Sequence, residues 1–284
     1  MKYKILLPTD FSINATQAIK YALQLYKDQE CLFYFLHVFK NSPKGIGNLR
    51  GKSAKSKSYT EAKSNAEVEL AKLLDTYSSG IGANANHSFE TKVVENDPLE
   101  AITDMVEEKD IDLVIMGTRG KTNAQSIAFG STAINVMEQV RNCPVIVVPQ
   151  LAKLRPPAEI VFPTSYETHF KKRELNYLIT IAKNCKASIR ILHVSIEHEL
   201  SKKQLNGKSM LMEYFEEVDY SFHKLSQMAV PAAINCFVES RESDMVAFIN
   251  RKHSMFGSVL TQPLVKAIGY NSSVPILVMH DLRN

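Results

Sequence analysis

Short apolar segments alternate along the chain with segments whose apolar residues recur every three or four positions. In the first half the apolar segments are 3–7, 31–38, 87–94, 113–116 and 145–148. Helical periodicity falls between them, most clearly at 15–25, 61–77 and 131–140. Apolar runs of this length are typical of strands buried on both faces. Five alternations of strand and helix therefore predict an α/β fold with a parallel sheet between two layers of helices.

Two of the expected helices carry N-terminal signals. Asp97 is an expected N-cap, followed by Pro98 in the first turn and by Glu100 at the capping-box position. Ser131 is the expected N-cap of the helix that follows Gly130. The apolar stripe expected on that helix is Ala133, Ile134, Met137 and Val140.

The second half of the chain repeats the pattern of the first. The matched segments are 5–9 with 159–164, 34–38 with 189–194, 87–89 with 220–222, 112–116 with 244–248 and 143–147 with 274–278. A polar stretch that contains Pro156-Pro157 separates the two copies. We therefore expect two tandem domains, 1–149 and 159–284, joined by a linker at 150–158.

The glycine-rich segment of the first copy has the layout of a phosphate-binding loop. Gly117 and Gly120 follow an apolar strand, and Gly130-Ser131-Thr132 then leads into a helix. Glycines allow backbone N–H groups to approach phosphate oxygens closely, and the N-terminus of a helix favours negative charge. Strand, glycine loop and helix N-terminus together indicate an anion site.

The second copy does not keep this chemistry. Its counterparts are Ser165 for Asp10, Ile249 for Gly117, Lys252 for Gly120 and Gln262-Pro263 for Gly130-Ser131, with a Gly257-Ser258 pair a few residues earlier. An isoleucine side chain fills space that a phosphate or ribose needs, and proline lacks an N–H donor. We therefore expect the second copy to have kept the fold and lost the site, and we interpret the glycines of the first copy as serving a ligand rather than the architecture.

These features resemble the universal stress protein family over essentially the whole chain. The resemblance rests on the tandem repeat, on Asp10, on His37-Val38 and on the spacing Gly117-x2-Gly120-x9-Gly130-Ser131. It implies two doubly wound domains, each a five-stranded parallel sheet in the order 3-2-1-4-5, paired through their fifth strands. The two copies would then form an intramolecular pseudo-dimer, and a homodimer of whole chains is equally consistent with the sequence.

The same resemblance implies a ligand, because family members with the intact glycine spacing typically bind ATP and those without it typically do not. By resemblance, Asp10 contacts the adenine or ribose region, Val38 lines the base pocket, and the glycine segment holds the ribose and phosphates. The candidate residues for binding an adenine nucleotide are Pro8, Thr9, Asp10, Val38, Met116, Gly117, Arg119, Gly120, Gly130, Ser131 and Thr132. No catalytic or metal-ligating residue is assigned.

The positions of these residues in the predicted sheet also indicate a binding site, independently of the family resemblance. In an open parallel sheet, ligands bind beyond the carboxyl ends of the strands, where the strand order reverses. Segments 8–10 and 117–120 each follow a strand, so they meet if those strands are neighbours. Each of these candidates also has an interpretation without a ligand. Asp10 would then cap the following helix, the glycines would form tight turns, and Arg119 would be a solvated side chain.

Composition limits the class of protein. The chain has 284 residues, a net charge of +4 and four isolated cysteines, which fits a two-domain cytoplasmic protein with reduced thiols. No signal peptide or membrane span is expected. Lysines and arginines gather at 40–57 without acidic residues, which suggests a phosphate lid or a nucleic-acid contact. A mobile, solvated loop is the favoured interpretation, and the lack of aromatic residues among the charges argues against nucleic acid.

Three functions remain open from the sequence. The first is an ATP-binding regulator of the stress response, with ATP, alone or with Mg²⁺, in the first copy. The second is an enzyme that hydrolyses ATP slowly or phosphorylates itself, although the chain has no GxxxxGK[ST] sequence and no carboxylate cluster for magnesium. The third is an interaction protein that binds no ligand.

Overall fold

The computed structural model describes residues 2–40, 52–80, 83–120, 129–195, 199–250 and 273–280, with only the backbone described at 52–58. The strands of the first half are β1 (Tyr3–Pro8), β2 (Cys31–Phe39), β3 (His87–Glu95), β4 (Leu113–Gly117) and β5 (Val145–Val148). Its helices are α1 (Ile13–Leu25), α2 (Lys52–Ser78), α3 (Pro98–Lys109) and α4 (Ser131–Gln139). The strands of the second half are β6 (Glu159–Pro163), β7 (Ser188–Val194), β8 (Tyr220–Leu225), β9 (Met245–Asn250) and β10 (Ile276–His280). Its described helices are α5 (Lys172–Cys185), α6 (Lys202–Tyr214) and α7 (Val230–Arg241).

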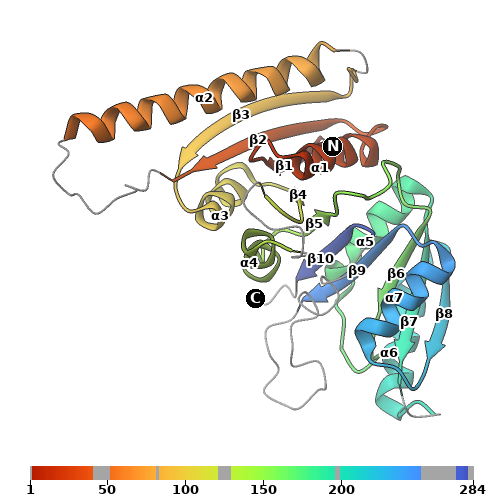
Figure 1. The fold of residues 1–284 in the computed structure, drawn as a ribbon. Helices are drawn as coiled ribbons and strands as arrows, with labels where there is room; N and C mark the ends of the chain where they lie inside the picture. The colour runs from red at the N-terminus through yellow and green to blue at the C-terminus, as the bar shows by residue number, and fades with distance from the viewer. Residues whose placement is uncertain are drawn as a thin grey trace.

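The described strands form one ten-stranded sheet in the order β3-β2-β1-β4-β5-β10-β9-β6-β7-β8. Each half therefore has the order 3-2-1-4-5, and within each half every pair is parallel. The tandem doubly wound α/β fold expected from the sequence is confirmed. In Figure 1, β1, β2 and β3 run across the view and β6, β7 and β8 run down it, as the twist of a long sheet requires.

The two halves join through their fifth strands. β5 and β10 are antiparallel, with Ile146 opposite Leu277 at the centre of the register. Both side chains are fully buried, and residues on either side of them pair in a symmetric way. The join is thus an approximate two-fold axis inside one chain, as the resemblance implied.

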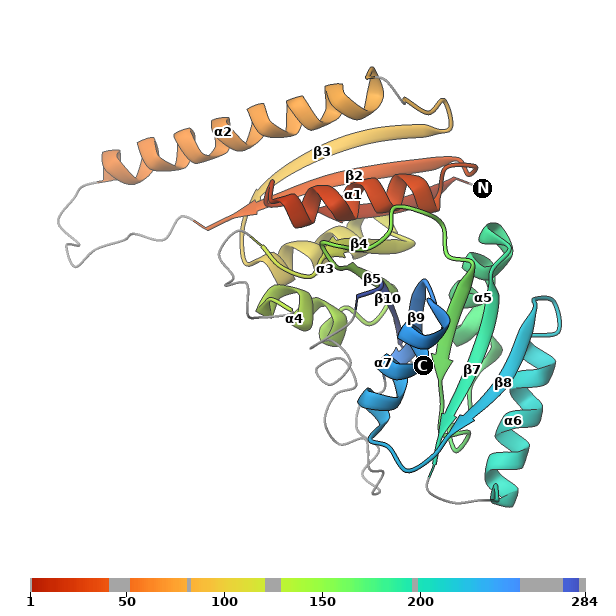
Figure 2. The ribbon, with the colours of Figure 1, turned by 45° about the vertical axis from the view of Figure 1, so that its right-hand side comes forward.

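Helices cover both faces of the sheet (Figures 1 and 2). On one face, α1 and α2 cover the first half, and α5 and α6 cover the second. On the opposite face, α3 and α4 cover the first half, and α7 covers the second. Each face carries one apolar cluster that continues across the β5–β10 join, so the two halves share their cores.

The register of the strands shows which residues of the two halves occupy equivalent positions. Leu113 pairs with Ile5 in the first half, and Met245 pairs with Ile160 in the second, which places Ile249 at the level of Gly117 as expected. The expected match of Tyr220 with His87 is wrong. Tyr220 pairs with Ile189, and the corresponding pair in the first half is Phe89 with Phe33, so the match is shifted by two residues.

Three local expectations also change. Gly130 is the N-cap of α4 and makes no side-chain cap, so Ser131 is the first helical residue rather than the cap. The buried stripe of α4 is Ala133, Val136 and Met137, with Ile134 only partly buried. Asp97 does cap α3 by accepting from the Leu99 N–H, but its own N–H donates to Asn96 and not to Glu100.

The basic segment at 40–57 is only partly a loop. Residues 41–51 lie outside the described part of the chain, while α2 begins at Lys52. The helix continues the pattern that was expected to start at Glu61, because nothing in 52–60 is a helix breaker. The interpretation of 52–57 as loop is therefore wrong.

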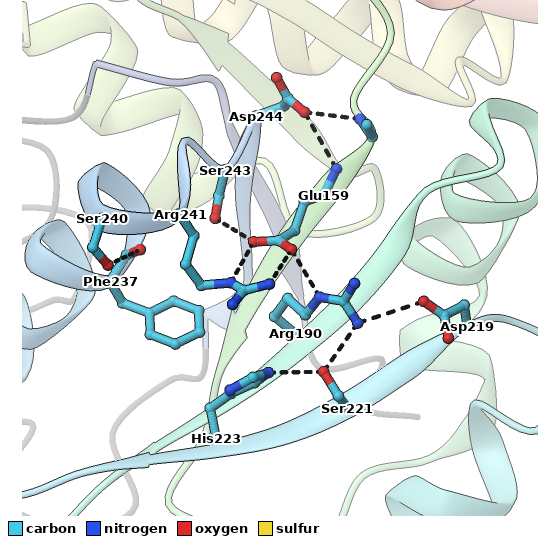
Figure 3. A network of polar contacts seen from close by, with 11 residues as sticks. Glu159, Arg190, Asp219, Ser221, His223, Phe237, Ser240, Arg241, Ser243 and Asp244 are labelled. Atoms are coloured by element: carbon cyan, nitrogen blue, oxygen red, sulfur yellow. Dashed lines mark hydrogen bonds and ion pairs between the residues drawn. The ribbon is translucent and has the colours of Figure 1, made fainter.

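An ion-pair network holds the amino ends of the strands in the second half (Figure 3). The carboxylate of Glu159, on β6, accepts from Arg190 at 2.8 Å, from Arg241 at 2.7 and 2.8 Å, and from the Ser243 hydroxyl at 2.7 Å. Burial alone would raise the pKa of Glu159, but these donors lower it to about 2. The network joins β6, β7 and the end of α7.

Candidate functional site

The two loops predicted to form the site lie side by side. β1 pairs with both β2 and β4, so the strand order reverses at β1, and the ends of β1 and β4 are neighbours. A Cβ built on Gly120 would lie 2.7 Å from the Asp10 Oδ2 atom. The expectation that segments 8–10 and 117–120 meet is confirmed.

The loop after β1 is held rigidly by local contacts. Thr9 is buried, its N–H donates to the Leu36 carbonyl at 2.8 Å, and its hydroxyl accepts from the Phe11 N–H at 3.1 Å. Phe11 adopts a left-handed conformation with φ of 61°, and its ring stacks on His37 at 4.5 Å. The His37 Nδ1 atom lies 2.8 Å from the Thr9 carbonyl oxygen. Phe11 and His37 thus fix the position of Asp10.

Asp10 has a local role as well as its place at the candidate site. Its Oδ1 atom accepts from the Ser12 N–H at 3.1 Å, and Ser12 in turn caps α1 by accepting from the Ala15 N–H. The carboxylate therefore supports the start of α1, as the capping alternative proposed. Its Oδ2 atom is the one that faces Gly120.

The loop after β4 depends on a residue that the sequence did not single out. Asn14, on α1, is buried, and its side chain hydrogen-bonds to Thr118 and to the Arg119 N–H. A Cβ on Gly117 would lie 2.9 Å from the Asn14 side chain. Packing against Asn14 therefore accounts for the first glycine inside the protein. The interpretation that the glycines serve a ligand rather than the architecture stays a prediction, and Gly117 by itself does not support it. The signal for Asn14 was a polar residue on the apolar face of an amphipathic helix.

The remaining candidate residues lie in three places around the two loops. At the start of α4, the Gly130 N–H donates to the Thr118 carbonyl at 2.8 Å, while Ser131 is exposed and Thr132 is partly buried. Met116 is buried and Val38 partly buried, both on the face of the sheet covered by α3 and α4. Pro8 lies at the end of β1, and Arg119 is held through its backbone.

The second half has the same loop without the same polar groups. Thr164 and Tyr166 repeat the turn, Tyr166 has φ of 62°, and its ring stacks on His193 at 4.6 Å. Ser165 stands at the position of Asp10, and its hydroxyl accepts from the Glu167 N–H at 3.3 Å. Positions 252, 257–258 and 262–263, which the sequence compared with the glycine segment, lie outside the described residues.

Among the described residues, no three His, Cys, Asp or Glu side chains come together as a metal site. Nor does the described part of the chain contain a helix with the length and apolar character needed to cross a membrane. What the geometry offers is a carboxylate, a glycine loop and a helix N-terminus at one edge of the sheet.

The known proteins that this chain resembles belong to one family. The profile of the universal stress protein family matches residues 1–149. Two curated relatives from Methanocaldococcus jannaschii are universal stress protein MJ0577, 32% identical over 157 residues, and universal stress protein MJ0531, 30% identical over 146 residues. These matches cover 52% and 51% of this chain and 95% and 81% of the relatives.

Solved structures extend the likeness to the whole chain. A universal stress protein from Archaeoglobus fulgidus is similar over 97% of both chains, with a TM-score of 0.69 and 19% identity. A protein from Pseudomonas aeruginosa described as a putative universal stress protein covers 98% of this chain and 92% of its own, with a TM-score of 0.55 and 12% identity. At these identities the likeness concerns the fold.

Proposed function

Because this chain belongs to the universal stress protein family, we propose that it is a regulatory protein of the stress response that binds ATP in its N-terminal half. The proposed nucleotide-binding domain is 1–149, the linker is 150–158, and 159–284 is a degenerate domain of the same family that carries no site. The ligand is an adenine nucleotide, and the residues proposed to hold it are those predicted from the sequence.

The observation that carries the proposal is the meeting of Asp10 with Gly120. The absence of a side chain at Gly120 leaves room for the Asp10 carboxylate at the edge of the sheet where ligands of this fold bind. A carboxylate in this position can accept hydrogen bonds from ribose hydroxyls, and the N–H groups at the start of α4 favour phosphate. The second half has Ser165 at the position of Asp10, which supports one site per chain.

The structure also gives the alternative some support. Asn14 accounts for Gly117 without any ligand, so a ligand-free interaction protein is the second candidate. Packing inside the protein likewise accounts for Gly120, whose missing side chain leaves room for Asp10. What favours a nucleotide over the ligand-free alternative is the Asp10 carboxylate at the carboxyl ends of the strands.

We expect this protein to act in the cytoplasm. The four cysteines are free, and burial raises the pKa of the Cys31 thiol to about 12 and that of the Cys185 thiol to about 11. Thiols of this kind are unreactive and fit a reducing compartment.

A titration of the purified chain with ATP, followed by an assay for released phosphate, separates the three functions. We expect saturable binding in the micromolar range with no turnover. Phosphate release or a phosphorylated protein would instead identify an enzyme, and the absence of binding would favour the ligand-free protein.

A further inference from the structure

Asn14 is the second residue of α1 and is only 5% exposed, although its side chain is polar. Its Nδ2 atom donates to the Val148 carbonyl at 3.0 Å. Its Oδ1 atom accepts from the Thr118 hydroxyl at 3.0 Å and from the Arg119 N–H at 2.7 Å. One buried amide therefore joins α1 to the end of β5 and to the loop after β4.

This amide reaches the loop because Gly117 has no side chain. A Cβ at position 117 would lie 2.9 Å from both Cγ and Oδ1 of Asn14, closer than real side chains approach. Any other residue at 117 would push Asn14 away from Thr118 and Arg119. Gly117 and Asn14 thus form a single packing unit.

The loop that Asn14 holds connects both parts of the candidate site. The Thr118 carbonyl accepts from the Gly130 N–H at 2.8 Å, which ties the start of α4 to the loop. At the end of the loop, Gly120 lies against Asp10. Moving Thr118 and Arg119 would therefore change the distance between the carboxylate and the N-terminus of α4.

The second half has lost both members of the unit. Ile249 replaces Gly117. Counting onward from Thr164 places His169 at the position of Asn14, whereas matching the buried residues of α5 to those of α1 places Glu174 there, so neither alignment gives an amide. The Asn14–Gly117 pair is therefore not repeated in the second half.

We propose that Asn14 is a positioning residue for nucleotide binding. It touches no ligand itself, and it holds the backbone at Thr118 and Arg119 so that Gly120, Asp10 and the start of α4 face one ligand. This inference rests on the proposed function. It follows from the general rule that pre-organised groups bind a ligand better than groups that must be ordered on binding.

The first test compares two variants with a control on the same helix as Asn14. Asn14→Ala removes the three hydrogen bonds, and Thr118→Val removes only one of them. Gln17→Ala is the matched control, since Gln17 is also on α1 and donates to a backbone carbonyl, that of Ala152 at 2.8 Å, away from the loop. We expect Asn14→Ala to weaken ATP binding about tenfold or more, Thr118→Val to weaken it less, and Gln17→Ala to leave it unchanged.

The second test needs no ligand and reads the loop itself. The Arg119 amide proton should exchange with solvent faster in Asn14→Ala than in the wild type, and at the wild-type rate in Gln17→Ala, as measured by NMR. Unchanged exchange at Arg119 would overturn the proposal. So would equal ATP affinity of the wild type, Asn14→Ala and Thr118→Val. A wild-type chain that binds no ATP would overturn the proposed function as well, which distinguishes the two failures.

Discussion

At the position of Asp10 the two halves differ in charge, because the second half has the neutral side chain of Ser165 there. Both halves keep the turn, the left-handed aromatic residue and its stacked histidine, so these features belong to the architecture. The carboxylate is present in the first half alone, and Ser165 provides the same local hydrogen bond to the backbone in the second. The carboxylate is therefore the part of the loop that the fold does not require.

Asp10→Ala should weaken ATP binding by roughly 1–3 kcal/mol, the scale of a lost charge-assisted hydrogen bond. Ser165→Ala is the matched control, because it removes the equivalent side chain from the second half. Isothermal calorimetry on both variants measures the effect. Equal dissociation constants for the wild type and Asp10→Ala would assign the carboxylate to capping of α1 alone.

Gly120→Ala tests the other side of the same contact. Its Cβ would displace the Asp10 carboxylate, so we expect binding to weaken about tenfold or more. Gly120 is exposed, so the free energy of unfolding should change by no more than about 0.5 kcal/mol. This variant is a better probe than Gly117→Ile, which would copy the residue of the second half. An isoleucine at 117 would also collide with Asn14 and disturb α1.

Among the elements, the strands were predictable and the ends of the helices were less so. Apolar runs such as 113–116 have one interpretation, because a strand buried on both faces is apolar throughout. Helix ends depend on which backbone N–H groups find partners in the folded chain. Gly130 is the N-cap of α4, and its N–H donates to the Thr118 carbonyl, a contact between segments that are separated in the sequence. The Asn14–Gly117 contact also joins distant segments, and no local pattern reports it.

The Glu159 network is the element that makes stability depend on pH. The pKa of Glu159 in the folded protein is about 2, below its usual value of 4.5. The network therefore stabilises the fold above about pH 4.5, and this stabilisation is lost as the pH falls toward 2. We expect Glu159→Gln to lower the free energy of unfolding at pH 7 by about 1–3 kcal/mol, because two arginines lose their shared carboxylate.

Urea denaturation between pH 2 and pH 7 measures this contribution. The stability difference between the wild type and Glu159→Gln should shrink through that acidic window. Glu242→Gln is the control, since the Glu242 side chain is 83% exposed and its ion pair with Lys153 spans 3.8 Å. A difference that stays constant from pH 7 to pH 2 would show that the network contributes no pH dependence.

At the scale of the whole molecule, the two halves are joined in a way that predicts cooperative unfolding. The sheet is continuous through β5 and β10, and each apolar cluster extends into both halves. The sequence alone predicted the repeat, while the strand order and the pairing of the fifth strands followed from resemblance to the family. That each apolar cluster serves both halves could not be predicted, because it depends on how the helices of the two halves pack around β5 and β10.

Leu277→Ala should therefore destabilise both halves together. Leu277 is fully buried in β10 opposite Ile146, and losing its side chain should cost about 2–5 kcal/mol. Differential scanning calorimetry should show a single transition in the wild type and a single, lower one in the variant. Leu205→Ala, at a position that is 50% exposed on α6, should shift the transition far less. Two separate transitions in the wild type would show that the halves unfold independently.

The central claim is one nucleotide site per chain, in the first half. Isothermal calorimetry of the intact chain with ATP, at a protein concentration well above the dissociation constant, measures the number of sites directly. We predict one site per chain that Asp10→Ala weakens and Ser165→Ala leaves unchanged. Two sites per chain, or no binding at all, would contradict the account.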